Sequence, residues 1–450
     1  MKKSFLILLA AVFFIGSLLA GEDDPYRIDL AAALKLADAD NNRIALARER
    51  IKQAEAELSL AKILILPDIS AGASYNRHDG PLQSSSGDIL DVKRSAGYAG
   101  LGSGAVGAGD MQVSGIGLNV DLGEAFYAPL VARQNLLAVK AESDAVKNQT
   151  LLMVAGAYFE LVRAQGNLEV ALEAHKNASE LAKTTKSFAD SGQGLTSDSE
   201  RSGVEALIRQ RGIAVAREVL AVRSVELARL LRLTVGTQLR ATSSPEARVQ
   251  WVDASRSAEE LIAEALVNRP ELRAGAAQLK GAEQSLNRTK LAPLFPKITV
   301  GASYGEFAGG RGSTISSAGN RTDLSVGVYW TLDGSGFGQH ARVKGKKSLR
   351  EQARLLRLDL EDGVAADVFN ALAAVQNRKS QIAAVAGAVN KARRSYELNR
   401  TRVFENQGLP IETLQAIQSL ATAQAMHRDA VIDYNLAQFQ LYTALGQPGE

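Results

Sequence analysis

The pattern of apolar and polar positions divides the chain into helical stretches and short strands. Between about 28 and 65, apolar residues recur at helical spacing among charged ones, with a polar break at Asp40 and Asn41. At about 68–76, apolar residues alternate with small polar ones, which predicts a strand with two different faces. Residues 77–110 are rich in glycine and serine, and we predict a long exposed loop there.

A second strand is predicted at about 113–122, and a helical pattern without proline then runs from about Val131 to Phe188. A glycine-rich turn separates this helix from a return helix that ends near residue 233. Thr196 or Ser197 is the predicted N-cap of the return helix. Such a pair of long helices fits antiparallel coiled-coil packing, although ordinary helical bundling produces the same periodicity.

The same order of elements then returns. The second copy contains a helix at 259–290 interrupted at Pro270, strands at about 297–305 and 322–332 around a short loop at 306–320, and long helices within 341–445. Pro410 fits the first turn of the last helix, and Glu412 falls in the turn that the helix dipole favours for acids. The fold class is therefore mainly α with a β part, built on a duplicated helix-strand-strand-helix-helix plan.

Two junctions show the duplication most clearly. Leu66-Pro67 and Phe295-Pro296 each end a helical pattern and open a strand. Proline cannot continue a helix and biases the preceding residue toward an extended backbone, so both junctions predict an abrupt change from helix to strand. We accordingly divide the chain into a first repeat at 21–245 and a second repeat at 246–450.

The N-terminus has the composition of a secretory signal peptide. Lys2 and Lys3 precede an apolar run, and small residues follow up to Ala20, which predicts a signal at 1–20. An N-terminal membrane anchor is the alternative, but the run is short for a spanning helix. The prediction is export, with secretion, the periplasm and an outer membrane as the possible destinations.

Charge, cysteine and histidine usage exclude several classes of function. Without the two lysines of the signal, 50 basic residues face 49 acidic ones, so nothing indicates a nucleic-acid partner. The chain has no cysteine, hence neither disulfides nor an acylated cysteine. The four histidines are scattered, and the glycine-rich stretch Gly334-Ser335-Gly336-Phe337-Gly338 lacks the third glycine of a dinucleotide loop. We therefore expect neither an enzyme nor a metal or other cofactor.

The four predicted strands are suited to a membrane. Each has about ten residues and one apolar face, which matches a strand that crosses a bilayer at a tilt. Tyr75, Tyr304 and Trp330 are placed to lie at the membrane interfaces. A soluble sheet covered by helices would show the same alternation. Four strands cannot close a barrel, so a spanning role requires several chains to pool their strands, and three chains would supply twelve.

The ordered set of motifs resembles the TolC-like outer-membrane efflux duct family over essentially all of the exported chain. It comprises the two proline junctions, Asn268-Arg269-Pro270-Glu271-Leu272, Ala157-Tyr158-Phe159-Glu160-Leu161 and two Gly-Leu turns. The first repeat departs from the pattern at Asn41-Asn42-Arg43-Ile44, which lacks the proline, and at Gly123-Glu124-Ala125, where a double-glycine corner is usual.

The resemblance implies a homotrimer in the outer membrane, with a 12-stranded β-barrel continued by a 12-helix α-barrel through the periplasm. It implies a passive exit duct for efflux or type I secretion, which opens on docking with a periplasmic adaptor protein and an inner-membrane transporter. The implied docking residues lie on the two turns between long helices: Gly192, Gly194, Leu195, Thr196, Asp198, Gly408, Leu409 and Pro410.

The turns, Glu412 and the function each admit a further interpretation. Glycine and proline at the turns are also explained by turn chemistry alone. Glu412 aligns with an acidic residue that narrows the lumen in relatives, which makes a ring of three Glu412 carboxylates a gate hypothesis. The alternative function is a periplasmic coiled-coil scaffold or adaptor, whose strands would form a small soluble domain.

Overall fold

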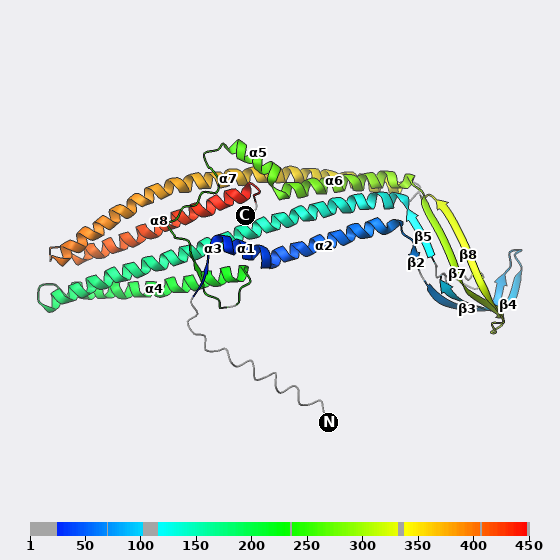
Figure 1. The fold of residues 1–450 in the computed structure, drawn as a ribbon, viewed down its shortest axis with the longest axis horizontal. Coiled ribbons are helices and arrows are strands. Elements are labelled where there is room, and N and C mark those ends of the chain that lie inside the picture. Colours follow the sequence, from blue (N-terminus) through cyan, green and yellow to red (C-terminus); the bar gives the residue numbers. More distant parts are fainter. Residues whose placement is uncertain are drawn as a thin grey trace, which may run out of the picture. The chain divides into compact units, whose positions relative to one another are not determined.

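A computed structural model of the protein describes residues 25–69, 71–101, 116–234, 236–331, 337–405 and 407–447 (Figure 1). The chain forms two compact units. The helical unit is drawn from 1–45, 146–269 and 364–450, and the sheet unit from 46–145 and 270–363. The predicted signal peptide at 1–20 and the Gly334-Ser335-Gly336 stretch lie outside the described residues.

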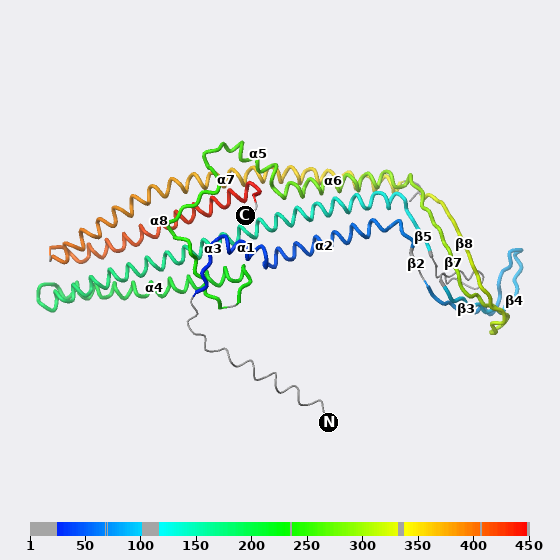
Figure 2. The backbone as a smooth tube through the Cα atoms, in the orientation of Figure 1, coloured from blue at the N-terminus to red at the C-terminus, as the bar shows by residue number. Residues whose placement is uncertain are grey.

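The helices follow the predicted order in both copies (Figure 2). They are α1 (Leu30–Asp40), α2 (Asn42–Lys62), α3 (Leu122–Asp190), α4 (Thr196–Leu230), α5 (Ala258–Asn268), α6 (Pro270–Leu291), α7 (Phe337–Phe404) and α8 (Pro410–Ala444). Helix α3 begins nine residues before the predicted start and contains Pro129. The prediction was too short because it placed the helix boundary after this proline.

The first helical pattern breaks at Asn41, as predicted, although no proline is present. The Asn41 side-chain oxygen accepts a hydrogen bond from the Arg43 backbone N–H at 2.9 Å, and its amide donates to the Leu230 carbonyl at 2.8 Å. A side chain that accepts from a first-turn N–H stabilises a helix start. In the second copy, the matching break has Arg269 as the C-cap of α5 and Pro270 as the first residue of α6. Asn41 thus stabilises the start of α2 by hydrogen bonding, whereas Pro270 stabilises the start of α6 by its fixed backbone.

Both predicted changes from helix to strand are confirmed. A single 3₁₀ turn precedes each proline, η1 (Ile63–Ile65) in the first copy and η2 (Ala292–Leu294) in the second. The following residues are extended, with ψ of 148° at Leu66 and 140° at Phe295. The duplicated sequence therefore folds in the same way twice at these positions.

Among the residues that the structure describes, the sheet unit contains one antiparallel sheet of six strand segments. They are β2 (Asp68–Ile69), β3 (Ala71–Gln83), β4 (Ile89–Leu101), β5 (Ile116–Asp121), β7 (Lys297–Arg311) and β8 (Ser317–Tyr329). Segments β4 and β5 pair with successive parts of one side of β7, and β8 pairs with the other side. Segments β3 and β2 pair in turn with β4 and β5. The sheet thus has four strand lines, in the order β2/β3, β4/β5, β7, β8, which matches the four predicted strands.

The predicted loop at 77–110 is wrong for residues 77–83 and 89–101, which are strands. These residues form the outer part of the β3–β4 hairpin, paired from Ala71 with Leu101 to Gln83 with Ile89. Strand hydrogen bonds are made by the backbone, so a composition rich in small residues does not prevent them. In the second copy, β7 and β8 likewise reduce the predicted loop at 306–320 to residues 312–316.

Some of the small residues in this region have a packing role. The Tyr98 side chain is only 3% exposed, and it lies over Gly305 of the neighbouring strand. A β-carbon built at Gly305 would come within 2.5 Å of the Tyr98 hydroxyl. Glycine at 305 therefore makes room for a tyrosine ring.

The helical unit has a compact core and a short parallel strand pair. Strand β1 (Tyr26–Ile28) pairs with β6 (Leu239–Ala241), and both contribute to a core that includes Tyr158, Leu161 and Leu227. The Tyr158 hydroxyl is satisfied by a 2.7 Å hydrogen bond with the Ser243 hydroxyl.

Buried amide side chains of α8 hold the segment after β6. The Asn435 side chain accepts from the Val249 N–H at 2.9 Å and donates to the Ala247 carbonyl at 2.7 Å. The Gln438 oxygen accepts from the Trp251 and Val252 N–H groups at 3.1 and 3.0 Å. These side chains replace strand partners for an irregular segment, since buried backbone groups need hydrogen bonds.

Candidate functional site: two helix turns and an apolar sheet face

The turn between α3 and α4 is built on two glycines. Gly192 has φ +73°, a conformation that favours glycine. The Gln193 and Gly194 N–H groups both donate to the Phe188 carbonyl, at 2.8 and 3.0 Å. A β-carbon built at Gly194 would lie 2.9 Å from the Phe188 β-carbon, so this position admits only glycine without a shift of the backbone.

The turn between α7 and α8 repeats this geometry. The Gln407 N–H donates to the Arg402 carbonyl at 2.8 Å. A β-carbon built at Gly408 would lie 2.9 Å from the Arg402 β-carbon. Each glycine lies six residues after the residue that it contacts, so the two turns are duplicates in backbone as well as in sequence.

A leucine, and not a hydroxyl residue, occupies the N-cap after each turn. Leu195 caps α4 and Leu409 caps α8, with nearly the same backbone angles and no side-chain cap hydrogen bond. The predicted N-cap at Thr196 or Ser197 is therefore wrong. Leu195 is 68% exposed and Leu409 60%. A leucine at this position neither caps the helix nor is buried, so it contributes little to the stability of the isolated chain.

The polar candidates lie in the helix turns that follow. Asp198 is in the first turn of α4, with an oxygen 3.7 Å from an Arg201 guanidinium nitrogen. Pro410 is the first residue of α8, as predicted, and Glu412 follows in its first turn. The Glu412 carboxylate lies 3.4 Å from a guanidinium nitrogen of Arg402. Glu412 is thus paired within its own helix hairpin.

The two helix hairpins pack together near their turns, at the same end of the helices in Figure 1. A small apolar cluster joins α3, α7 and α8: Ala174, Leu181, Val403, Leu414 and Ile417. Arg400 of α7 lies 3.5 Å from Glu180 of α3. The buried hydroxyls of Thr185 and Ser202 hydrogen bond at 2.6 Å between α3 and α4. The eight docking candidates are therefore presented by one packed helical end.

The sheet has one apolar and one polar face. On the apolar face, Ile298 and Val300 of β7 pair with Val328 and Val326 of β8. The face continues through Leu324, which is 76% exposed. Large aliphatic side chains that are exposed in the single chain indicate a surface that is covered in the native environment.

Opposite-face residues of the same strands are polar. Lys297 lies 3.5 Å from Asp121, and the Arg321 guanidinium contacts Asp323 at 2.8 Å. The Ser303 hydroxyl donates to the same Asp323 carboxylate at 3.5 Å. Alternation between lipid-facing apolar and lumen-facing polar residues is characteristic of membrane β-barrels.

The three predicted interface aromatics are all exposed, at the two ends of the apolar face. Tyr75 and Tyr304 lie at one end and share hydrogen bonds with neighbouring strands, Tyr75 to Ser95 at 3.3 Å and Tyr304 from Asn320 at 3.4 Å. Trp330 follows β8 at the other end. From Lys297 to Tyr304 are seven steps of about 3.3 Å, or about 23 Å along the strand. That length is close to the height of the apolar band of a membrane barrel, about 25 Å.

One charged cluster was missed by sequence reasoning. Arg163 of α3 hydrogen bonds to Asp429 and Asp433 of α8, both at 2.6 Å, and to Glu160 at 3.1 Å. Burial disfavours its charged form, but the hydrogen bonds to Asp433 and Asp429 outweigh this effect and raise the pKa of Arg163. The only signal in the sequence is the pair of acids four residues apart on the last helix, which also fits a solvated face.

Two classes of site can be checked over the described residues. No three or more His, Cys, Asp or Glu side chains gather there in an arrangement that would hold a metal ion. Among the same residues, none of the helices combines the length and apolar character needed to span a membrane.

Comparisons with known proteins agree with this geometry. A family model described as outer membrane efflux protein matches residues 261–447. The pyoverdine export outer membrane protein OpmQ of Pseudomonas putida is 24% identical over 439 residues, covering 93% of this chain and 86% of OpmQ. The chain is thus similar to outer membrane efflux proteins, by the family model in its second half and by OpmQ over most of its length.

Solved outer membrane channels share the fold of this chain. The CmeC outer membrane channel of Campylobacter jejuni matches with a TM-score of 0.76 at 15% identity, over 94% of this chain and 87% of CmeC. The outer membrane protein VceC of Vibrio cholerae matches with a TM-score of 0.72 at 17% identity, over 94% of this chain and 97% of VceC. The family consists of efflux channels and not of enzymes, and its location is the outer membrane.

Proposed function

We propose that the protein is the passive exit duct of a tripartite export system, which spans the outer membrane and the periplasm as a homotrimer. Three copies would form a 12-stranded β-barrel continued by a 12-helix α-barrel. The observation that carries this proposal is the open, two-faced sheet. The match to the outer membrane efflux protein model favours the duct over the alternative of a periplasmic scaffold.

The edges of the sheet support assembly. Within the described residues, the outer sides of β3 and β8 have no strand partner. In lipid, each unsatisfied backbone group costs several kcal/mol, so an open edge cannot remain beside an apolar face that enters a membrane. Pairing β8 of one copy with β3 of the next removes both edges, and three copies supply twelve strand lines.

The duplication supports a regular wall. Each proposed repeat, 21–245 and 246–450, supplies two strand lines and one hairpin of long helices. In a trimer these would alternate around the axis as six similar units. Helices α3 and α7, with 69 and 68 residues, are long enough for a periplasmic tube.

The two helix turns are the proposed contact with the adaptor protein and, through it, with the inner-membrane transporter. Leu195 and Leu409 support this proposal because each is exposed at a helix start where a hydroxyl residue would stabilise the helix better. Both lie beside a glycine that fixes the shape of the turn. Exposed leucines on a rigid turn favour an apolar contact with a partner.

Glu412 remains the proposed gate residue. Its place in the first turn of α8, next to the docking turn, supports a role in which adaptor contact changes the charge that faces the lumen. Glu412 is paired with Arg402, so loss of this ion pair would leave three uncompensated carboxylates in the trimer.

The test uses the absence of cysteine in the natural chain. A cysteine at Asn76 of β3 is combined, one at a time, with a cysteine at Arg321, Asp323 or Ser325 of β8 in the whole protein. Oxidation of the outer-membrane fraction should give disulfide-linked trimers on a denaturing gel for at least one pair.

Two controls make this result specific. Each single-cysteine variant should remain a monomer on the same gel. Cysteines at Thr299 and Gly327, which are partners inside one sheet, should close within the chain and give no trimer. If every β3–β8 pair stays monomeric in protein recovered from outer membranes, the shared barrel is wrong.

A further inference from the structure

Two arginines face each other at the end of the β4–β7 strand pair. Arg94 of β4 is the direct partner of Arg311 of β7, and His78 of β3 is the partner of Arg94 on the other side. Direct partners on neighbouring antiparallel strands point to the same face, with their β-carbons about 5 Å apart. Like charges in this arrangement destabilise a sheet, so the stability of the fold does not account for the pair. We refer to Arg94 and Arg311 as the rim arginines.

The rim arginines lie on the polar face of the sheet. Arg311 comes seven residues after Tyr304, which belongs to the apolar face, and an odd number of steps along a strand changes the face. Seven steps of about 3.3 Å also place Arg311 about 23 Å beyond Tyr304 along the strand. Strand β7 begins at Lys297, shortly after η2, and ends at Arg311. The rim arginines are therefore at the end of β7 that is farther from the helices of the sheet unit.

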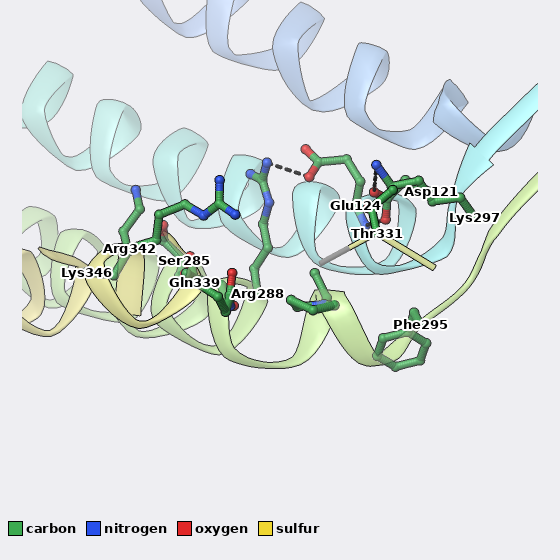
Figure 3. Close-up of a pocket in the computed structure, with 13 residues that line it drawn as sticks. Asp121, Glu124, Ser285, Arg288, Phe295, Lys297, Thr331, Gln339, Arg342 and Lys346 are labelled. Carbon is green, nitrogen blue, oxygen red and sulfur yellow. Dashed lines mark hydrogen bonds and ion pairs between the residues drawn. The ribbon is translucent and has the colours of Figure 1, made fainter. Parts of the chain in front are cut away.

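The other lysine and arginine residues on the polar face of β4, β7 and β8 have acidic partners. Lys297 lies 3.5 Å from Asp121 (Figure 3), and the Arg321 guanidinium contacts Asp323 at 2.8 Å. Among the described residues, neither rim arginine has a carboxylate partner, and the Arg94 Nε is buried without a hydrogen-bond acceptor. The polar face thus has an excess of positive charge at this end.

The opposite face of the same hairpin shows the contrast. Arg77 of β3 and Lys93 of β4 each precede a residue of the basic row by one position, so they point to the other face. Both lie close to one carboxylate, that of Asp79, at 3.3 and 3.4 Å. Cations are therefore matched by an acid on one face of these strands and left unmatched on the other, which an ordinary solvated surface does not explain.

In the proposed trimer, the polar face of the sheet lines the lumen of the barrel. Each chain contributes two rim arginines, so three copies place six guanidinium groups around the outer opening. Rings of arginine or lysine side chains make a pore selective for anions. A narrow opening with walls of low dielectric also concentrates the electrostatic potential of such a ring.

We infer that the rim arginines form an anion-binding ring at the outer mouth of the duct, and that the exported cargo is a soluble organic anion. Guanidinium groups bind carboxylate oxygens through paired hydrogen bonds, and an anion between two opposed guanidinium groups also offsets their repulsion. The inference rests on the proposed function, because only a closed barrel turns the polar face into a lumen. In that barrel the polar face does not contact lipid, which excludes a phospholipid headgroup as the source of the anion.

The experiment measures the block of single-channel current by citrate, a soluble tricarboxylate, in planar bilayers that contain the whole protein. Citrate should reduce the current through the natural protein, whereas glucose, a neutral solute, should not do so at the same concentration. The rim variant, Arg94→Gln/Arg311→Gln, should need about tenfold more citrate for half of the block, the factor expected for the loss of one hydrogen bond to a charged group.

Two control variants separate charge from structure. Arg77→Gln/Lys93→Gln removes two cations from the opposite face of the same hairpin, and it should be blocked like the natural protein. Arg94→Lys/Arg311→Lys keeps the positive charges and should retain most of the block. Glu412 is unchanged in all of these variants, so the proposed gate is the same in each.

The inference is overturned if citrate blocks the rim variant as strongly as the natural protein, or if both glutamine variants lose the block equally. A natural channel that citrate does not block has the same meaning. These results leave the proposed function intact, because a channel has formed. A protein that forms neither channels nor the disulfide-linked trimers of the cysteine experiment would instead contradict the proposed function, and the inference with it.

Discussion

Gly194 packs against Phe188 so closely that a β-carbon at Gly194 would come within 2.9 Å of the Phe188 β-carbon. The same relationship holds between Gly408 and Arg402 in the second copy, also at 2.9 Å. Phe188 and Arg402 have little in common as side chains. The duplicated feature is therefore the path of the backbone, and glycine is required by that path.

Replacing either glycine should distort its turn. Gly194→Ala and Gly408→Ala each force a displacement of the preceding helix end, and we expect each to lower the free energy of unfolding by about 1–3 kcal/mol. Thermal or denaturant unfolding of the whole protein measures the effect. Gly203→Ala is the control, because a β-carbon there meets nothing within 4 Å and alanine favours a helix. Equal stability of all three variants would show that the turns adapt at no cost.

The exposed leucines should separate stability from function. Leu195→Ser and Leu409→Ser place a good N-cap at each helix start, so the unfolding free energy should stay the same or rise by up to about 1 kcal/mol. Efflux and adaptor cross-linking should nevertheless decrease, because the proposed apolar contact is lost. A serine variant that exports normally would argue that turn chemistry alone accounts for these positions.

The Arg163 cluster should contribute more to stability than a surface pair. Arg163→Gln leaves Asp429 and Asp433 with fewer donors in a partly buried site, and we expect a loss of about 2 kcal/mol. The control, Arg223→Gln, breaks an exposed pair with Glu226 and should cost less than about 0.5 kcal/mol. Chemical denaturation compares the two variants, and similar losses would contradict the assigned role of the cluster.

Substitutions of Glu412 and its partner should act in opposite directions. Glu412→Gln removes the carboxylate, so channels in planar bilayers should conduct more or lose cation preference. Arg402→Gln leaves the carboxylate uncompensated, so cation preference should increase. Single-channel reversal potentials in a salt gradient measure both. Unchanged selectivity in the two variants would remove Glu412 as a gate candidate.

Much of the fold was predictable because the signals are local. The junctions at Leu66-Pro67 and Phe295-Pro296 act on their own backbone, so the change from helix to strand follows from proline alone. The helix break at Asn41 was likewise visible as a polar interruption. The β3–β4 extension was missed because its glycines and serines have no strand preference of their own, and its hydrogen bonds come from neighbouring strands.

The candidate site, like the fold, was predictable from the sequence only in part. The turn residues, Glu412 and the interface aromatics were identified from spacing and resemblance. Their geometry, such as the pairing of Glu412 with Arg402 or the leucine caps, was not. The Arg163 cluster joins residues 266 and 270 positions apart, and the charges of either helix alone resemble an ordinary solvated surface.

By itself, the sequence determined the duplication, the order of helices and strands, and the two faces of each strand, because apolar periodicity and proline act within a few residues. Only the tertiary structure decided which strands lie side by side, which buried amides hold the segment at 247–252, and that Arg163 meets Asp429 and Asp433. These features depend on contacts between segments that are distant in the chain. Such a contact stabilises the fold only when both segments are already in place, so neither segment predicts it alone.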